Sequence, residues 1–271
     1  MFKIDNQIQV IVKKDLKEQL HDRANLFGFI FLSLFISVIL PSLVCIAAFK
    51  TDQNSVHGFD QIIQMISKIS NIPQNITEYG AVIYVIYKYL LFSLILLLPV
   101  MFSNITAIYS FVGEKEKRTA ESMLCTPISE RSLVLGKILA SFIPAMLLTF
   151  ICVVMYSIIA DIAVYHACGF LLFPTADWFL TYFLIAPAIV FLSITLVVAV
   201  SQKVKSSKSA QSVSMILVFP IIGSLISQIS GSLVVTTPIL LAMFAVIAII
   251  DFTAFRIVYK KFDKENYLLN L

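Results

Sequence analysis

Charged side chains of both signs gather in one short stretch of an otherwise apolar sequence. The run GEKEKRTAESMLCTPIS covers residues 113 to 129, and six of its 17 residues are charged. Glu114 lies three residues before Lys117 and four before Arg118, and the next acidic residue, Glu121, follows Lys117 by four. Oppositely charged side chains at these spacings stabilise an exposed helix. The run therefore predicts a short, self-supporting helix whose charges form ion pairs.

The opposite side of this predicted helix is apolar, and the residues after it favour an immediate restart. Met123 and Leu124 lie on the arc away from the charges. Thr126 followed by Pro127 is typical of the N-cap and first position of a new helix, with Ser129 as an alternative cap. A stiff element with a small apolar surface, joined directly to the apolar segments on both sides, is what a cytoplasmic motor would need in order to push on them.

The sequence lacks the motifs that indicate a catalytic or nucleotide-binding site. It contains no HExxH, no GxSxG and no GxxxxGK[ST] phosphate loop. Its three histidines, His21, His57 and His166, are far apart and lack the spacing of metal ligands. We therefore expect no catalytic residue, metal site or cofactor in this chain, and any ATP and Mg²⁺ would be used by another polypeptide.

The rest of the chain has the composition of a membrane protein. Of its 271 residues, 59% are hydrophobic and 13% are charged, and the mean hydropathy is +0.93. Soluble domains contain about 25% charged residues, and a transmembrane helix needs roughly 20 apolar residues. The sequence therefore predicts an all-α, polytopic membrane protein with six transmembrane helices. Their predicted ranges are 25–49, 84–111, 133–160, 178–200, 211–231 and 237–258.

The distribution of lysine and arginine predicts the orientation. With both termini in the cytoplasm, 17 of the 20 lysines and arginines lie on the cytoplasmic side, as the positive-inside rule requires. The net charge of +4 is then a topology signal and gives no reason to expect nucleic-acid binding. The predicted parts are a cytoplasmic interfacial helix over 1–24, a transmembrane domain over 25–258 with an external loop at about 50–83, and a basic cytoplasmic tail over 259–271.

The N-terminal segment predicts an amphipathic helix in the membrane interface. Apolar residues recur every four positions, and charged residues occupy the remaining arc. The apolar positions are Ile4, Ile8, Val12, Leu16 and Leu20. Such a helix either anchors the chain or acts as a lever that couples a cytoplasmic partner to the first span.

Polar residues inside the predicted spans are candidates for a substrate path, because burying polar groups in lipid is costly. They equally well hydrogen-bond a neighbouring helix. The candidates are Asn104, Thr106, Tyr156 and Gln228. Prolines inside five spans predict kinks; these are Pro41, Pro99, Pro144, Pro187 and Pro220. The sequence leaves open whether Cys45 and Cys168, both near the outer surface, form a disulfide.

The run from Glu114 to Ser129, continued by Leu135-Gly136-Lys137, resembles the coupling region of type-2 ATP-binding-cassette (ABC-2) permeases. That region reads approximately E-K-E-x-x-T-x-E-x-L-x-x-T-P-[VI]-S and is followed by G-K. Arg118 stands where glycine is frequent, and Cys125 stands where serine or another small residue is usual. Neither difference changes the predicted helix. The interfacial helix, six spans, polar second inner loop and basic tail extend the resemblance along the whole chain in weaker form.

The resemblance implies a permease that pairs with a second permease, identical or different, and docks on two copies of an ABC ATPase subunit. Residues 114 to 126 would form the coupling helix, seated in a cleft of the ATPase, which would bind ATP and Mg²⁺. The coupling residues would be Glu114, Glu116, Lys117, Arg118, Thr119, Glu121, Met123, Leu124, Thr126, Pro127 and Ser129.

The function expected from these features is ATP-driven export through the cytoplasmic membrane. The substrate would be hydrophobic or amphipathic: a lipid, drug, peptide or lipid-linked glycan. Two alternatives remain open from the sequence. One is a membrane component that does not transport, such as an immunity protein or sensor, and the other is a secondary carrier driven by an ion gradient.

Overall fold

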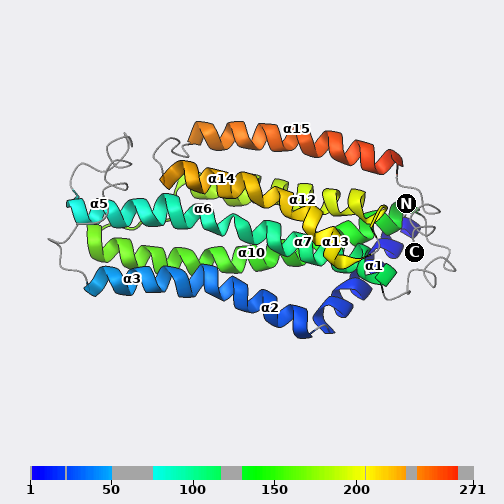
Figure 1. The fold of residues 1–271 in the computed structure, drawn as a ribbon, viewed down its shortest axis with the longest axis horizontal. Helices are drawn as coiled ribbons and strands as arrows, with labels where there is room; N and C mark the ends of the chain where they lie inside the picture. The colour runs from blue at the N-terminus through cyan, green and yellow to red at the C-terminus, as the bar shows by residue number, and fades with distance from the viewer. Residues whose placement is uncertain are drawn as a thin grey trace.

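The computed structural model of the chain describes residues 2–21, 23–50, 76–116, 130–204, 206–229 and 237–261. The regular structure in these ranges is entirely helical, which confirms the all-α prediction. The helices lie side by side in an elongated bundle (Figure 1). They are α1 (Phe2–His21), α2 (Arg23–Leu34), η1 (Phe35–Ile39), α3 (Leu40–Lys50), α5 (Glu78–Val85), η2 (Ile86–Leu91), α6 (Phe92–Ile95), α7 (Leu97–Phe111), α8 (Gly113–Glu116), α10 (Glu130–Cys168), α11 (Ala176–Leu180), η3 (Thr181–Ile185), α12 (Ala186–Ser201), α13 (Ser207–Ser214), η4 (Met215–Leu217), α14 (Val218–Ile229) and α15 (Thr237–Lys261).

Six helical stretches of the described chain are long and apolar enough to cross a membrane, which confirms the predicted number. They are Ile30–Ala47, Tyr79–Glu116, Ser132–Cys168, Ala176–Ser201, Ser207–Gln228 and Thr237–Ile257. The second span is central, because 72% of the residues in its most apolar stretch are buried in the bundle. The corresponding fraction for the sixth span is 11%. The chain is therefore a multi-pass membrane protein built around its second span.

Two span boundaries differ from the predicted ones because local signals override hydropathy. The second span begins at Glu78, where the Thr77 hydroxyl caps the helix by accepting a hydrogen bond of 3.1 Å from the Gly80 backbone N–H. The third span continues to Cys168, and Gly169 ends it with a φ of +78°. A glycine in this left-handed conformation is a common helix stop.

Four of the five prolines lie two or three residues after a departure from α-helical geometry: Pro99 after the turn at Leu96, Pro220 after the 3₁₀ turn η4, and the other two after π-helical turns. Pro41 and Pro187 each follow a π-helical turn, η1 and η3, by two residues. A proline ring clashes with the carbonyl group four residues earlier. In both cases that carbonyl lies in the π turn, whose wider backbone accommodates the ring. Pro144, by contrast, lies inside α10, which is α-helical throughout.

Helix α1 packs against α10 by more than the predicted apolar stripe. Ile8, Val12 and Leu16 are only partly buried, whereas Ile11 and Asp15 are buried. A Cβ added at Gly136 of α10 would lie 2.9 Å from Ile11 Cγ2, so the missing side chain of this glycine allows the close approach. The helix is therefore docked on the bundle through a face that includes a buried carboxyl group.

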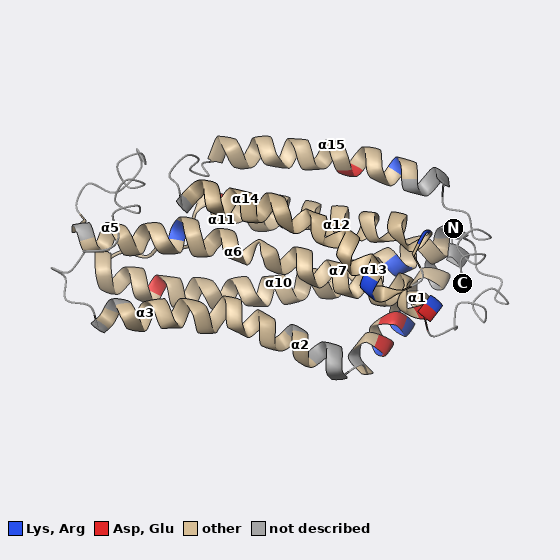
Figure 2. Cartoon of the chain, viewed as in Figure 1, with Lys and Arg blue, Asp and Glu red and all other residues tan. Residues whose placement is uncertain are grey.

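Among the described residues, the charged ones concentrate at one end of the bundle, around α1, α7 and α13 (Figure 2). The last turns of α15 lie at the same end (Figure 1), as an even number of spans requires. We call this the α1 end, and the opposite end, which holds α5, the α5 end. A small apolar cluster joins α14 and α15 to the rest of the bundle; it consists of Leu96, Val100, Ile185, Ile189, Ile221 and Leu240.

Candidate functional site

The first residues of the predicted coupling run form α8 at the α1 end. Glu114 and Lys115 are buried, with exposed fractions of 6% and 4%, whereas Glu116 is exposed. Buried lysine and glutamate side chains are rare in proteins unless they are paired. The start of the coupling run is therefore embedded in the bundle and is not a solvated charge run.

Glu114 accepts hydrogen bonds from two lysines on different helices. Its Oε2 lies 2.5 Å from Lys137 Nζ of α10, and its Oε1 lies 2.7 Å from Lys14 Nζ of α1. Lys137 also donates to the Ser110 backbone carbonyl of α7 and lies over the Phe111 ring. Because Lys137 is only 1% exposed, these partners replace the water contacts that its ammonium group lacks.

Asp15 of α1 completes this arrangement, which we call the Glu114 cluster and define as Lys14, Asp15, Ser110, Glu114 and Lys137. The Ser110 hydroxyl donates to Asp15 Oδ2 at 2.5 Å, and Lys137 Nζ lies 3.8 Å from the same oxygen. Burial raises the pKa of Asp15, although Lys137 and the Ser110 hydroxyl act in the opposite direction. Burial lowers the pKa of Lys14, but the hydrogen bond and charge of Glu114 outweigh it, so that the pKa of Lys14 is raised.

The two lysines and two carboxyl groups of the Glu114 cluster balance each other in charge. Carboxylate oxygens of Asp15, Glu18 and Glu114 approach within 4.8 Å of one another, a spacing that could hold a metal ion. Lys14 contacts Glu114 at 2.7 Å and Glu18 at 3.5 Å, and Lys137 contacts the other oxygen of Glu114. The ammonium groups thus already supply the positive charge that a metal ion would bring.

The next two residues of α8 hold two further helices. Lys115 Nζ donates to the Ser201 carbonyl at the end of α12, at 2.8 Å. Glu116 Oε2 accepts from the Ser207 hydroxyl at the start of α13, at 2.5 Å. Three consecutive side chains therefore connect α8 to α1 and α10, to α12 and to α13, while the backbone connects it to α7.

The structure describes only part of the predicted coupling set. Glu114 and Glu116 are placed as given above, and the predicted coupling residues from Lys117 to Ser129 lie outside the described residues. Sequence reasoning assigned no role in the site to Lys14, Asp15 or Lys115. The sequence placed Asp15 one helical turn after the apolar Ile11, but only the structure shows that Ile11 is buried and that both residues lie on the docked face of α1.

The four candidate path residues do not come together in one site, and each hydrogen-bonds within the bundle. Asn104 accepts from the Ser193 hydroxyl at 2.7 Å, and Thr106 donates to backbone carbonyls that include Ser141 at 3.2 Å. The Tyr156 hydroxyl donates to the Tyr87 carbonyl at 2.5 Å. These three side chains join neighbouring helices.

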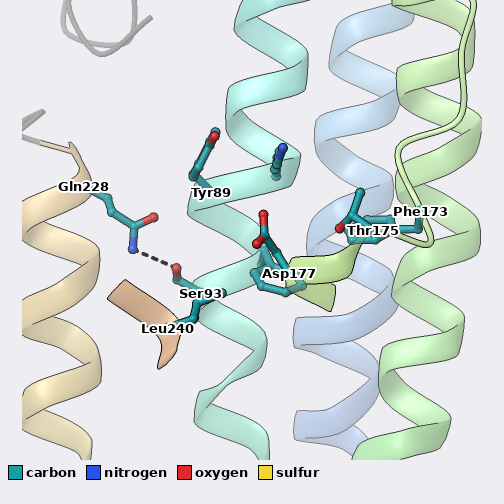
Figure 3. A pocket seen from close by; sticks show the side chains of 9 residues that line it. Tyr89, Ser93, Phe173, Thr175, Asp177, Gln228 and Leu240 are labelled. Atoms are coloured by element: carbon teal, nitrogen blue, oxygen red, sulfur yellow. Dashed lines mark hydrogen bonds between the residues drawn. The ribbon is translucent and has the colours of Figure 1, made fainter. Parts of the chain in front are cut away.

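Gln228 differs from the other three because only part of its amide is satisfied. It is fully buried, and its NH₂ group donates to Ser93 Oγ at 2.8 Å (Figure 3). Its Oε1 has no hydrogen-bond partner within the described chain. The thiols of Cys45 and Cys168 are free, and Cys168 Sγ donates to the Gly80 carbonyl at 3.3 Å.

Comparison with known families matches this architecture. A family model described as ABC-2 family transporter protein matches residues 9–240, a range that includes the whole Glu114 cluster and most of the bundle. A search of curated proteins finds no match. Because the family model covers well over half of the 271 residues, the chain belongs to the ABC-2 transporter family as a polytopic membrane permease.

Proposed function

We propose that the chain is the membrane subunit of an ATP-driven exporter and that the segment from 113 to 129 receives the force of a separate ABC ATPase. The observation that carries this proposal is the position of α8, where Glu114, Lys115 and Glu116 each hold different helices. A displacement of the segment that follows α8 would reach α1, α10, α12 and α13 together. This is the connectivity that rigid-body movement of a helix bundle requires.

In this mechanism, closure of the ATPase subunits moves the coupling segment, and α8 transmits the movement to the bundle. The Glu114 cluster keeps α1 and α10 attached to α8 during the stroke, because separating its charges in a buried site is costly. Helices α7 and α10, which flank the coupling run in sequence, would tilt with it. The exporter would then open a path for a hydrophobic or amphipathic substrate.

The same proposal fixes the orientation and the partners. The α1 end would face the cytoplasm, in agreement with the positive-inside rule, and the chain would lie in the cytoplasmic membrane with both termini inside. The assembly would contain two ATPase subunits, which bind ATP and Mg²⁺, and a second permease, either another copy or a different chain. Family membership supports the association with an ATPase.

The first test is purification of the tagged chain from its native membrane in mild detergent. The proposal predicts that an ATPase with Walker motifs copurifies in a fixed ratio and that the eluate hydrolyses ATP in a vanadate-sensitive manner. Reproducible absence of such a protein, with the chain intact, would contradict the proposal. Transport that collapses with uncouplers and needs no ATPase would indicate a gradient-driven carrier. Protection of cells against a toxic peptide without ATP turnover would indicate an immunity protein or sensor.

The second test changes the predicted coupling residues. Glu121→Lys and Leu124→Asp should separate ATP hydrolysis from export while leaving insertion unchanged, because they alter the surface offered to the ATPase. Lys203→Glu is the matched control, since this exposed charge follows α12 and is not part of the coupling run. Normal coupling in the first two variants would remove the assignment of residues 114 to 126 as the coupling helix.

A further inference from the structure

A small polar niche lies toward the α5 end, where several spans converge. Gln228 reaches into it from α14 and Asp177 from α11, with Ser93 of α6 near Gln228 (Figure 3). Lys88, Tyr89 and Thr175 also line the niche. Polar side chains of both charge signs thus line the same small niche.

The niche contains groups whose hydrogen-bonding capacity is only partly used. Gln228 is fully buried, and its Oε1 lacks a partner among the described residues. Leaving a buried acceptor unsatisfied is unfavourable, so this oxygen is suited to accept a proton donor from a ligand. Asp177 Oδ1 accepts from the Thr237 hydroxyl at 2.5 Å, and an ionised carboxylate has further acceptor positions.

Lys88 supplies the opposite charge on another side of the niche. Its Nζ donates to the Tyr84 hydroxyl at 2.7 Å and lies 5.1 and 5.7 Å from the ring centroids of Tyr84 and Tyr89. Within the described ranges, no carboxylate lies within 4.0 Å of it, and it therefore forms no ion pair with Asp177. The niche consequently offers one cation and one anion at separate positions.

The free volume of the niche restricts what enters it. It measures about 20 Å³, which is close to the space that one water molecule needs. A primary ammonium group fits this space, whereas a trimethylammonium group is much larger. The chemistry and the volume together favour a small, positively charged hydrogen-bond donor beside Gln228 and Asp177.

An apolar groove of about 540 Å³ lies next to the niche, between α12, α14 and α15. Its walls include Leu96, Ile189, Leu217, Ile221 and Met243. The single polar side chain among its described lining residues is Ser224, whose hydroxyl already donates to the Ile221 carbonyl at 2.7 Å. The groove therefore accommodates an apolar chain and offers it no polar contact.

The groove and the niche are both lined by α14, α15 and the second span. Ser224 in the groove lies one turn from Gln228 in the niche, and Leu96 lies three residues from Ser93. Along α15 the groove extends from Ile239 to Ile250, a length of about 16 Å at 1.5 Å per residue. This length is close to half of a hydrocarbon core of about 30 Å. The groove thus matches an acyl chain of one leaflet.

We infer that the chain binds a phospholipid of the leaflet at the α5 end, with one acyl chain in the groove and a head group that carries a phosphate and a primary ammonium. The ammonium group donates to Gln228 Oε1 and to the Asp177 carboxylate. The phosphate lies at the mouth of the niche beside Lys88. Binding requires no partner ATPase, so this inference stands or falls separately from the proposed function.

The test is native mass spectrometry of the purified chain with an equimolar mixture of phosphatidylethanolamine and phosphatidylcholine that have identical acyl chains. We expect the ethanolamine lipid to be retained about tenfold more than the choline lipid, as one charge-assisted hydrogen bond allows. Asp177→Asn keeps an acceptor for Thr237 but removes the negative charge, and it should bring the ratio close to one. Gln228→Leu should also lower the ratio.

A second pair of variants tests the groove. Met243→Trp fills it and should reduce retention of both lipids, whereas Ile249→Trp is the control, because Ile249 is exposed on α15 and does not line the groove. Equal retention of the two lipids by the parent chain would overturn the inference. An ethanolamine preference that survives Asp177→Asn, or retention unchanged by a correctly inserted Met243→Trp, would also overturn it. Should Met243→Trp fail to insert, the ratio in Asp177→Asn decides.

Discussion

Replacing Glu114 by glutamine tests whether the Glu114 cluster holds the α1 end together. Glutamine has nearly the same shape, but it removes the only carboxylate that contacts both Lys14 and Lys137 at hydrogen-bonding distance among the described residues. Lys137, which is 1% exposed, would then keep Asp15 at 3.8 Å as its nearest described carboxyl group. Since burial raises the pKa of Asp15, this group is a poor substitute.

The size of the expected stability loss follows from the burial of Glu114 and Lys137. Removing one member of a buried ion pair costs about 3–5 kcal/mol, because the remaining charge is left uncompensated. Glu116→Gln is the matched control on the same helix, since Glu116 is exposed. Its side chain accepts an exposed hydrogen bond from Ser207, which a glutamine oxygen can still accept, so the loss should not exceed about 1 kcal/mol. The two variants should therefore differ by at least about 2 kcal/mol in the free energy of unfolding.

The assay is equilibrium unfolding by denaturant in detergent micelles, followed by tryptophan fluorescence. The sequence contains a single tryptophan, and Trp178 packs against Tyr182 at a centroid distance of 5.4 Å, so its emission should respond to loss of the bundle. Adding Lys137→Met to Glu114→Gln should restore part of the loss, because the orphaned charge is removed. Unfolding of Glu114→Gln within 1 kcal/mol of the parent, with no difference from Glu116→Gln, would refute the role of the cluster.

Three other changes have defined outcomes. Gly136→Val should lower the free energy of unfolding by about 1–3 kcal/mol and increase the cleavage of α1 by added protease, because the new Cβ would lie 2.9 Å from Ile11. Gly28→Val is the control and should have neither effect, because nothing lies within 4 Å of a Cβ added there. Asp161→Ala should lower the free energy of unfolding by about 1–3 kcal/mol, since its carboxylate accepts two backbone N–H groups at 2.8 Å, whereas Asp161→Asn should lose less. Burial raises the pKa of Asp15 above 3.8, so the folded chain holds the Asp15 proton to a higher pH than the unfolded chain, and stability falls as pH rises from the unfolded to the folded pKa. The melting temperature of Asp15→Asn, measured relative to that of the parent, should therefore rise from about pH 4 upward. A melting temperature of Asp15→Asn that falls further below that of the parent as pH rises would contradict this prediction.

The sequence alone determined the class of protein and the number of spans. Hydropathy over about 20 residues reports whether a helix can remain in lipid, and this signal depends on composition and not on neighbouring helices. The resemblance of the run after Glu114 to ABC-2 coupling regions likewise required only the order of residues. The family match confirms that the chain belongs to the ABC-2 family, and the coupling role of the run stays a prediction. Residues that end a helix, such as Gly169, were also present in the sequence, but a hydropathy average does not detect them.

Only the tertiary structure decided which polar residues meet. Asp15 and Lys137 are 122 positions apart in the sequence, and helical periodicity relates residues only within one helix. Asn104, Thr106 and Tyr156 were recognisable as polar groups inside spans, but their partners depend on which helices pack together. The polar niche around Gln228 depends on the same packing, because its lining comes from four different spans. Side-chain contacts between helices depend on the packing of the whole bundle, and no local pattern in the sequence encodes them.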